Sequence, residues 1–102
     1  MTTKKRRLPV KTAPIHMIDE WEGWNFVART NPTMGTLADL QGGDFDKMIP
    51  ALEAMIIKWD FVDEAGNDLP QPQDGGIKYL TVDLLNVVTA LISKKIIDVP
   101  KD

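Results

Sequence analysis

Apolar residues recur at helical spacing through the middle of the chain. They are separated by one or three positions, which places them on one face of an α-helix; the set is Phe45, Met48, Ile49, Leu52, Met55, Ile56 and Trp59. Either Asp44 or Asp46 can cap the start of this helix. Pro50 fits only in a first helical turn, because it has no N–H to donate, and it kinks a helix that starts earlier. The pattern predicts a helix that begins between Asp46 and Ile49 and stops around Trp59.

A second helical pattern fills the C-terminal part of the chain. Thr81 is suited to cap it, and Asp83 lies in the first turn, where a carboxylate interacts favourably with the helix dipole. Lys94 and Lys95 mark its C-terminal end. Its apolar stripe consists of Leu84, Leu85, Val88, Leu91 and Ile92. The aliphatic residues within 96–99 form either the last buried turn of this helix or an exposed segment for a partner.

The N-terminal third shows strand-like alternation instead. Trp24, Phe26 and Ala28 share one face at a period of two, whereas the residues between them face the other way. A β-leaning run at 15–18 precedes them, and Gly23 tolerates the positive φ that a reversal needs. These features predict a small antiparallel hairpin. Its apolar face must pack on the helices or on another chain, because two strands alone are marginally stable.

Weaker signals connect these elements. Asn31 and Pro32 suit the N-cap and the first position of a short helix, which a Gly-Gly pair ends. The stripe of this short helix is Met34, Leu37 and Leu40. Residues 63–67 have turn chemistry, because a glycine or an asparagine there suits the left-handed region. Residues 69–76 are rich in Pro, Gln and Gly, follow neither period and are predicted to be a connector.

Together these signals predict an α+β fold that is mostly helical. A small N-terminal β-hairpin is followed by two main amphipathic helices plus a short helix. A chain of 102 residues is long enough for one domain. We divide it into a flexible basic arm at 1–14, a single small domain at 15–97 and a C-terminal tail at 98–102.

The predicted arm concentrates positive charge. Its basic residues are Lys4, Lys5, Arg6, Arg7 and Lys11. The arm is either a nucleic-acid or anchoring contact, or a solvated tail that becomes ordered against a neighbour. Four clustered charges are a small electrostatic footprint, and a net charge of −3 argues against a protein that coats nucleic acid. We expect a solvated tail and no nucleic-acid partner.

The composition is typical of a soluble globular domain, with 43% hydrophobic and 26% charged residues. No apolar run reaches the roughly 18 residues that indicate a membrane span. The basic start is not followed by the apolar core of a secretory signal. We therefore expect no membrane association and a cytoplasmic location.

Residues that carry chemistry are scarce. There is no cysteine and one histidine, His16, and a single histidine is more commonly a structural side chain than a catalytic base. The acidic loop that starts at Asp60 fails the calcium-binding EF-hand pattern, because Ala65 and Gln71 replace the required Gly and Glu. No phosphate-binding loop or nucleophile elbow occurs. The sequence predicts no catalytic, cofactor-binding or metal-binding residue, and we expect a protein that is not an enzyme.

Large apolar side chains are numerous for the size of the chain. Five Met and three Trp are either core residues or a surface for apolar partners. Such side chains mostly lie inside proteins, but three short elements offer limited room for them. Methionine also suits surfaces that accept varied partners. A binding or assembly protein is the class that this composition favours.

One stretch resembles a known family. Residues 55–70 read Met-Ile-Ile-Lys-Trp-Asp-Phe-Val-Asp-Glu-Ala-Gly-Asn-Asp-Leu-Pro, and a Pro/Gly connector and a capped Leu-Leu helix at 80–92 follow. This arrangement resembles the tail assembly chaperones of long-tailed bacteriophages, especially those that infect actinobacteria. The segment 24–33, Trp-Asn-Phe-Val-Ala-Arg-Thr-Asn-Pro-Thr, is also similar to that family. The resemblance spans residues 15–95 and is most specific between Trp59 and Pro70.

The resemblance implies a chaperone that binds the tape measure protein, a long helical chain that sets tail length. The chaperone would keep that chain soluble until tail-tube subunits polymerise around it. The tail-tube protein is a second candidate partner, and self-association is expected. The implied location is the host cytoplasm during virion assembly, outside the mature virion. Family members often have a short form and a frameshifted long form, and this chain would be the short form or the shared N-terminal part. The Lys4–Arg7 cluster and Pro50 depart from the family pattern.

The candidate partner-binding residues follow from the predicted helical faces beside Trp59. A helix-in-groove contact needs an apolar groove, which both long helices would frame. The candidate residues are Met55, Trp59, Phe61, Leu84, Val88 and Leu91. Trp59→Ala or Val88→Asp is expected to weaken the contact. The alternative function is a structural virion protein, such as a head-tail connector or a tail-terminator-like subunit, and a third is a small DNA-binding protein that uses the basic arm.

Overall fold

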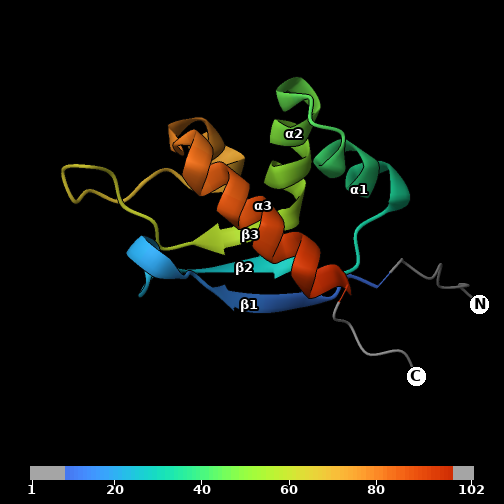
Figure 1. Cartoon of the computed structure of the whole chain (residues 1–102), viewed down its shortest axis with the longest axis horizontal. Helices are drawn as coiled ribbons and strands as arrows, with labels where there is room; N and C mark the ends of the chain where they lie inside the picture. The colour runs from blue at the N-terminus through green and yellow to red at the C-terminus, as the bar shows by residue number, and fades with distance from the viewer. Residues whose placement is uncertain (1–8, 98–102) are drawn as a thin grey trace, which may run out of the picture.

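Three β-strands and three α-helices make up the domain in the computed structural model, which describes residues 9–97 (Figure 1). The strands are β1 (Thr12–His16), β2 (Asn25–Arg29) and β3 (Ile56–Trp59), and the helices are α1 (Met34–Gln41), α2 (Phe45–Met55) and α3 (Val82–Ile97). Short 3-10 helices are η1 (Asp19–Trp21), η2 (Pro72–Asp74) and η3 (Gly76–Tyr79). The predicted α+β class is confirmed.

The sheet is antiparallel, with β2 in the middle and β1 and β3 beside it. Ile15, Phe26 and Trp59 are aligned across the three strands, so their side chains share one face. All three are buried. In the neighbouring row, Pro14 and Lys58 lie on the opposite face and are exposed. The predicted hairpin and its buried apolar face are confirmed, and a third strand completes them.

The helices pack against the buried face of the sheet. Figure 1 shows α3 crossing the sheet obliquely, with α2 and α1 beyond it. The apolar stripe of α3 belongs to the same core cluster as Phe26 and Ile56. Leu84 N–H donates to Thr81 Oγ1 at 3.4 Å, which confirms the predicted cap of this helix. Ile96 packs against the core, so of the two alternatives for this segment the last helical turn is correct there.

Strand β1 begins inside the range predicted for the basic arm. Thr30 N–H donates to Lys11 O at 2.8 Å, and Asn31 Nδ2 donates to Pro9 O at 2.7 Å. The predicted arm boundary at residue 14 is wrong, because pairing with β2 orders the end of that range. Residues 1–8 of the arm and the tail at 98–102 lie outside the described residues.

Residues 56–59 form a strand where the sequence predicts the end of a helix. The last hydrogen bond of α2 runs from Ile56 N–H to Leu52 O, and the chain then pairs with β2. The apolar spacing suits a helix, but two consecutive β-branched residues, Ile56 and Ile57, also suit an extended backbone. A partner strand distant in sequence decides between the two. The predicted continuation of the helix to Trp59 is therefore wrong.

Helix α2 begins earlier than predicted. Asp44 is its N-cap, and its carboxylate accepts from Asp46 N–H at 3.0 Å. The helix starts at Phe45, so the predicted start between Asp46 and Ile49 is wrong and Pro50 lies inside the helix. Pro50 removes the donor for the Asp46 carbonyl, but both residues are exposed, so water can satisfy that carbonyl.

Helix α1 begins later than predicted. Its N-cap is Thr33, whose hydroxyl accepts from Thr36 N–H at 3.3 Å. The predicted cap, Asn31, instead accepts from Lys11 N–H at 2.9 Å and from Arg29 Nε at 3.2 Å. The prediction of an Asn31 cap is wrong because β1 and β2 provide this side chain with other partners.

The Pro/Gln-rich connector covers the outer edge of β3. Gln71 Oε1 accepts from Trp59 N–H at 3.1 Å, and Gln71 Nε2 donates to Trp59 O at 3.1 Å. Gln73 Nε2 donates to Ile56 O. These side-chain amides occupy the places that a fourth strand would take. They satisfy an edge that would otherwise be open to pairing with another chain.

We predict that Gln71→Ala lowers the free energy of unfolding by about 1–2 kcal/mol, because two backbone groups of Trp59 lose their partners. Gln41→Ala is the matched control, because Gln41 is exposed at the end of α1. Urea unfolding of both variants measures the difference. Equal stability of the two variants would contradict the assigned role of Gln71.

Candidate partner-binding groove

An aromatic stack holds together the region of the family resemblance. The ring of Phe61 lies 4.7 Å from that of Trp59 at an interplanar angle of 17°, and 5.0 Å from that of Trp24 at 30°. Phe26 meets it edge to face at 6.0 Å. Trp59 Nε1 donates to Pro70 O at 3.0 Å. Phe61 is therefore the centre of a packed cluster that fixes both ends of the following loop.

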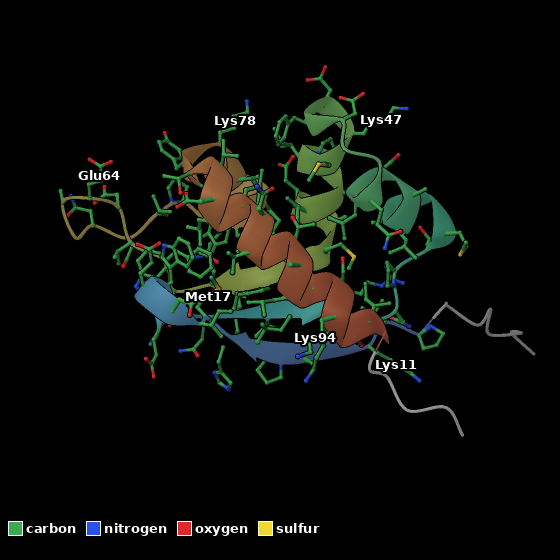
Figure 2. All side chains as sticks on the ribbon, viewed as in Figure 1. Lys11, Met17, Lys47, Glu64, Lys78 and Lys94 are labelled. Atoms are coloured by element: carbon green, nitrogen blue, oxygen red, sulfur yellow. The ribbon has the colours of Figure 1, made fainter. Side chains whose placement is uncertain are left out.

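The loop after Phe61 is a narrow hairpin. Leu69 N–H donates to Phe61 O at 3.0 Å, and Val62 forms a β-bridge with Asp68. Asp63 Oδ1 accepts from the N–H groups of Ala65 and Asn67, each at 2.9 Å. Gly66 occupies the left-handed region with φ of 85°, so the predicted turn is confirmed. The loop projects from the domain, and Figure 2 shows Glu64 near its tip.

A groove of about 500 Å³ lies between this loop, η1 and the start of α3. Its lining is largely apolar, and we call it the aromatic groove. The residues that line it are Trp21, Trp24, Val62, Asp63, Glu64, Ala65, Leu69, Tyr79, Thr81 and Leu84. Trp21 and Trp24 are half-buried, and Tyr79 is 65% exposed. Aromatic side chains that are partly packed against the domain and partly exposed to solvent are suited to binding an apolar partner.

The rim of the aromatic groove is acidic. Asp63 and Glu64 are its charged lining residues, and both are exposed. A hydrogen bond with the Thr81 side chain lowers the pKa of Asp83, which follows the groove-lining Thr81 in the chain. Lys78 adjoins Tyr79 but does not line the groove. Carboxylates beside an apolar floor favour a partner that is apolar and positively charged.

The structure does not support the binding face predicted from the sequence. Within residues 9–97, five of the six candidates are buried in the core, with exposed fractions of 0–6%: Met55, Trp59, Phe61, Leu84 and Val88. Leu91 is half-buried and lines a different hollow, between β1 and the end of α3. Of the six, Leu84 also lines the aromatic groove. The prediction is wrong as a surface, because the helical stripes face the sheet that β3 completes.

Sequence reasoning missed the residues that do reach the surface. Trp21, Trp24, Val62 and Tyr79 were not candidates, although each lines the aromatic groove. Two signals point to them. Trp21 is a large apolar residue in an acidic turn, and Tyr79 is an aromatic residue between the predicted connector and the predicted helix cap, Thr81. Neither position belongs to a predicted apolar stripe, so neither side chain had a predicted place in the core.

Two other kinds of site are absent from the described part of the chain. Residues 9–97 contain no group of His, Cys, Asp and Glu side chains that could hold a metal ion. No helix among them has the length and apolar character needed to cross a membrane. His16 Nδ1 lies 2.5 Å from Asn25 Oδ1, and Asn25 Nδ2 donates to Asp60 Oδ2 at 3.3 Å. These contacts are exposed and link β1, β2 and the start of the loop.

Comparisons with protein-family models, with curated proteins and with solved structures found no match. The class of this protein is therefore described from its fold and its groove. The described chain is a two-layer α+β domain with an acid-rimmed apolar groove at one end.

Proposed function

We propose that this protein is a phage tail assembly chaperone that binds the tape measure protein and keeps it soluble for tail-tube polymerisation. The observation that carries the proposal is the aromatic groove, which borders the stretch of strongest family resemblance. Residues 62–65 and Leu69 form one wall of it, and they lie within the Trp59–Pro70 stretch. The function is binding, with no bond made or broken.

The aromatic groove replaces the surface first predicted for this contact. A helix in a groove inserts apolar side chains spaced three or four residues apart. A volume of about 500 Å³ is within the roughly 300–1,000 Å³ range typical of binding pockets, and it accommodates a few such side chains. Trp21, Trp24 and Tyr79 would cover the apolar stripe of a tape measure helix, which would otherwise associate with other apolar surfaces.

A chaperone of this kind must release its partner. A shallow contact with one stripe of a helix favours dissociation when tail-tube subunits compete for the same chain, because affinity differences reside mainly in the dissociation rate. Several copies along one tape measure protein would cover its successive apolar stripes. The proposed place of action is the host cytoplasm during assembly, before the mature virion forms.

We predict that Tyr79→Ala weakens binding of coexpressed tape measure fragments about tenfold, because an exposed aromatic anchor is lost. Phe45→Ala is the matched control, because Phe45 is also a partly exposed aromatic residue but lies at the start of α2, away from the groove. Recovery of soluble tape measure protein and calorimetric titration measure the effect.

Two results would contradict the proposal. One is a tape measure protein that gains no solubility from the wild-type chain. The other is detection of this chain in purified mature particles. That result would support the alternative function, a structural virion protein such as a connector or tail-terminator-like subunit.

A further inference from the structure

We infer that the occupant of the aromatic groove is a cationic amphipathic helix, whose apolar stripe enters the groove and whose Lys or Arg side chains meet Asp63 and Glu64. This inference rests on the proposed function, because it takes the groove as the binding site. It adds the chemistry of the bound segment, which the resemblance does not specify.

Charge distinguishes this groove from two other hollows of the described chain. The aromatic groove has two carboxylates and no basic residue in its lining. The hollow on the open face of the sheet, about 310 Å³, includes Lys58 beside Asp60. The hollow between β1 and α3, about 260 Å³, is lined by Lys94 and Lys95 and has no carboxylate. A basic partner is therefore attracted to the aromatic groove and repelled from the hollow beside α3.

Further exposed carboxylates lie near the groove in the chain. Figure 2 shows Glu64 at one end and Lys11 at the opposite end. Next to the groove-lining Trp21 in the chain, Glu20 and Glu22 are exposed carboxylates. These carboxylates, at η1 and on the loop after Phe61, would steer a basic segment toward the groove before contact.

The rim is held in a defined position. Asp63 Oδ1 accepts from two backbone N–H groups of its own turn, which fixes the carboxylate at the mouth of the groove. Glu64 is the next residue and is exposed. Beneath them, Val62 and Leu69 form an apolar wall. A helix with Lys or Arg beside its apolar stripe would contact the apolar wall with the stripe and the acidic rim with its basic side chains. An acidic helix would instead place carboxylates next to the carboxylates of the rim.

The test uses three synthetic amphipathic helices of about 18 residues that share one leucine stripe at helical spacing. They differ in carrying Lys, Gln or Glu at the remaining positions. Binding to the full chain is measured by calorimetry at low and high salt. We expect the Lys helix to bind about tenfold more tightly than the Gln helix at low salt, with the Glu helix weakest. The difference should shrink at high salt, because exposed charges are screened.

Asp63→Asn with Glu64→Lys is the decisive variant, because asparagine preserves the acceptor of the turn while the rim charge is reversed. Asp39→Asn with Asp74→Lys changes the net charge equally at exposed positions outside the groove. The first variant should lose the preference for the Lys helix, and the second should keep it. Thermal unfolding of both variants checks that they are folded.

The outcomes separate this inference from the proposed function. Equal binding of the three helices, or a preference for Lys that survives the rim variant, overturns the inference. Self-association that the rim variant abolishes also overturns it, because the occupant is then a second copy of the chain. Tape measure binding that is insensitive to salt and to the rim variant leaves the proposed function intact and refutes the inference. A preference for the Lys helix without any binding of the tape measure protein supports the inference about the groove and refutes the proposed function.

Discussion

Val88→Asp is expected to unfold the protein at neutral pH. Val88 is fully buried on α3, and the core formed by residues 9–97 contains no buried polar or charged side chain to pair with a carboxylate. An unpaired buried charge costs about 3–5 kcal/mol, which is comparable with the lower end of the roughly 5–15 kcal/mol range of domain stabilities, where small domains lie. Loss of the far-UV circular dichroism signal, or a large fall in the urea midpoint, measures this effect.

Ala90→Asp is the control on the same helix, because Ala90 is exposed. Its effect should be close to the small difference in helix propensity, below about 1 kcal/mol. Burial raises the pKa of the carboxyl introduced at position 88. Its destabilisation should therefore be full at neutral pH and should diminish as the pH falls toward about 4, where the carboxyl is also neutral in the unfolded chain. Equal stability of the two variants would mean that the stripe of α3 is exposed, as first predicted for partner binding.

Gly76→Ala is expected to destabilise the domain by about 3 kcal/mol or more. A Cβ at this position would overlap Pro70 O and would lie 2.5 Å from Trp59 Cζ2. The first of these atoms belongs to the backbone and the second to a packed ring, so neither can move aside without disturbing the aromatic stack. Overpacking of this severity commonly costs 1–3 kcal/mol or more. Chemical unfolding of the variant measures the loss.

Gly35→Ala provides the opposite case. A Cβ at Gly35 meets no atom within 4 Å, and the residue lies in α1. Alanine there should stabilise the domain by roughly 0.5–1 kcal/mol, because glycine has the larger conformational entropy in the unfolded chain. If Gly76→Ala left the stability unchanged or raised it, as Gly35→Ala is expected to do, the close approach of η3 to Trp59 would be incorrect.

The burial of Val88 and Trp59 also bears on the proposed function. The Val88 and Trp59 substitutions first suggested as binding tests would act on folding, because these side chains are in the core. Loss of binding in such variants would not identify a contact residue. Tyr79 and the carboxylates of the rim are the informative positions, because they are exposed and line the groove.

Local signals in the sequence were sufficient for several elements. The alternation at 24–29 predicts β2, and Thr81 with the stripe after it predicts α3 from its cap onward. The turn at 63–67 follows from Gly66, the residue there that adopts a positive φ. Each of these depends on neighbouring residues, through hydrogen bonds of the cap or the turn, or through the burial of one face.

The tertiary structure decided the rest, because partners distant in sequence determined the outcome. Pairing with β2 makes residues 56–59 a strand, although their spacing also suits a helix. Once β3 completes the sheet, the apolar stripes of α2 and α3 are buried against it, and five of the six predicted binding residues become core. The groove arises where η1, the loop after Phe61 and the start of α3 meet, at positions with no shared periodicity. The sequence by itself determined which residues are apolar and the α+β class, whereas three-dimensional packing determined which apolar residues remain exposed to a partner.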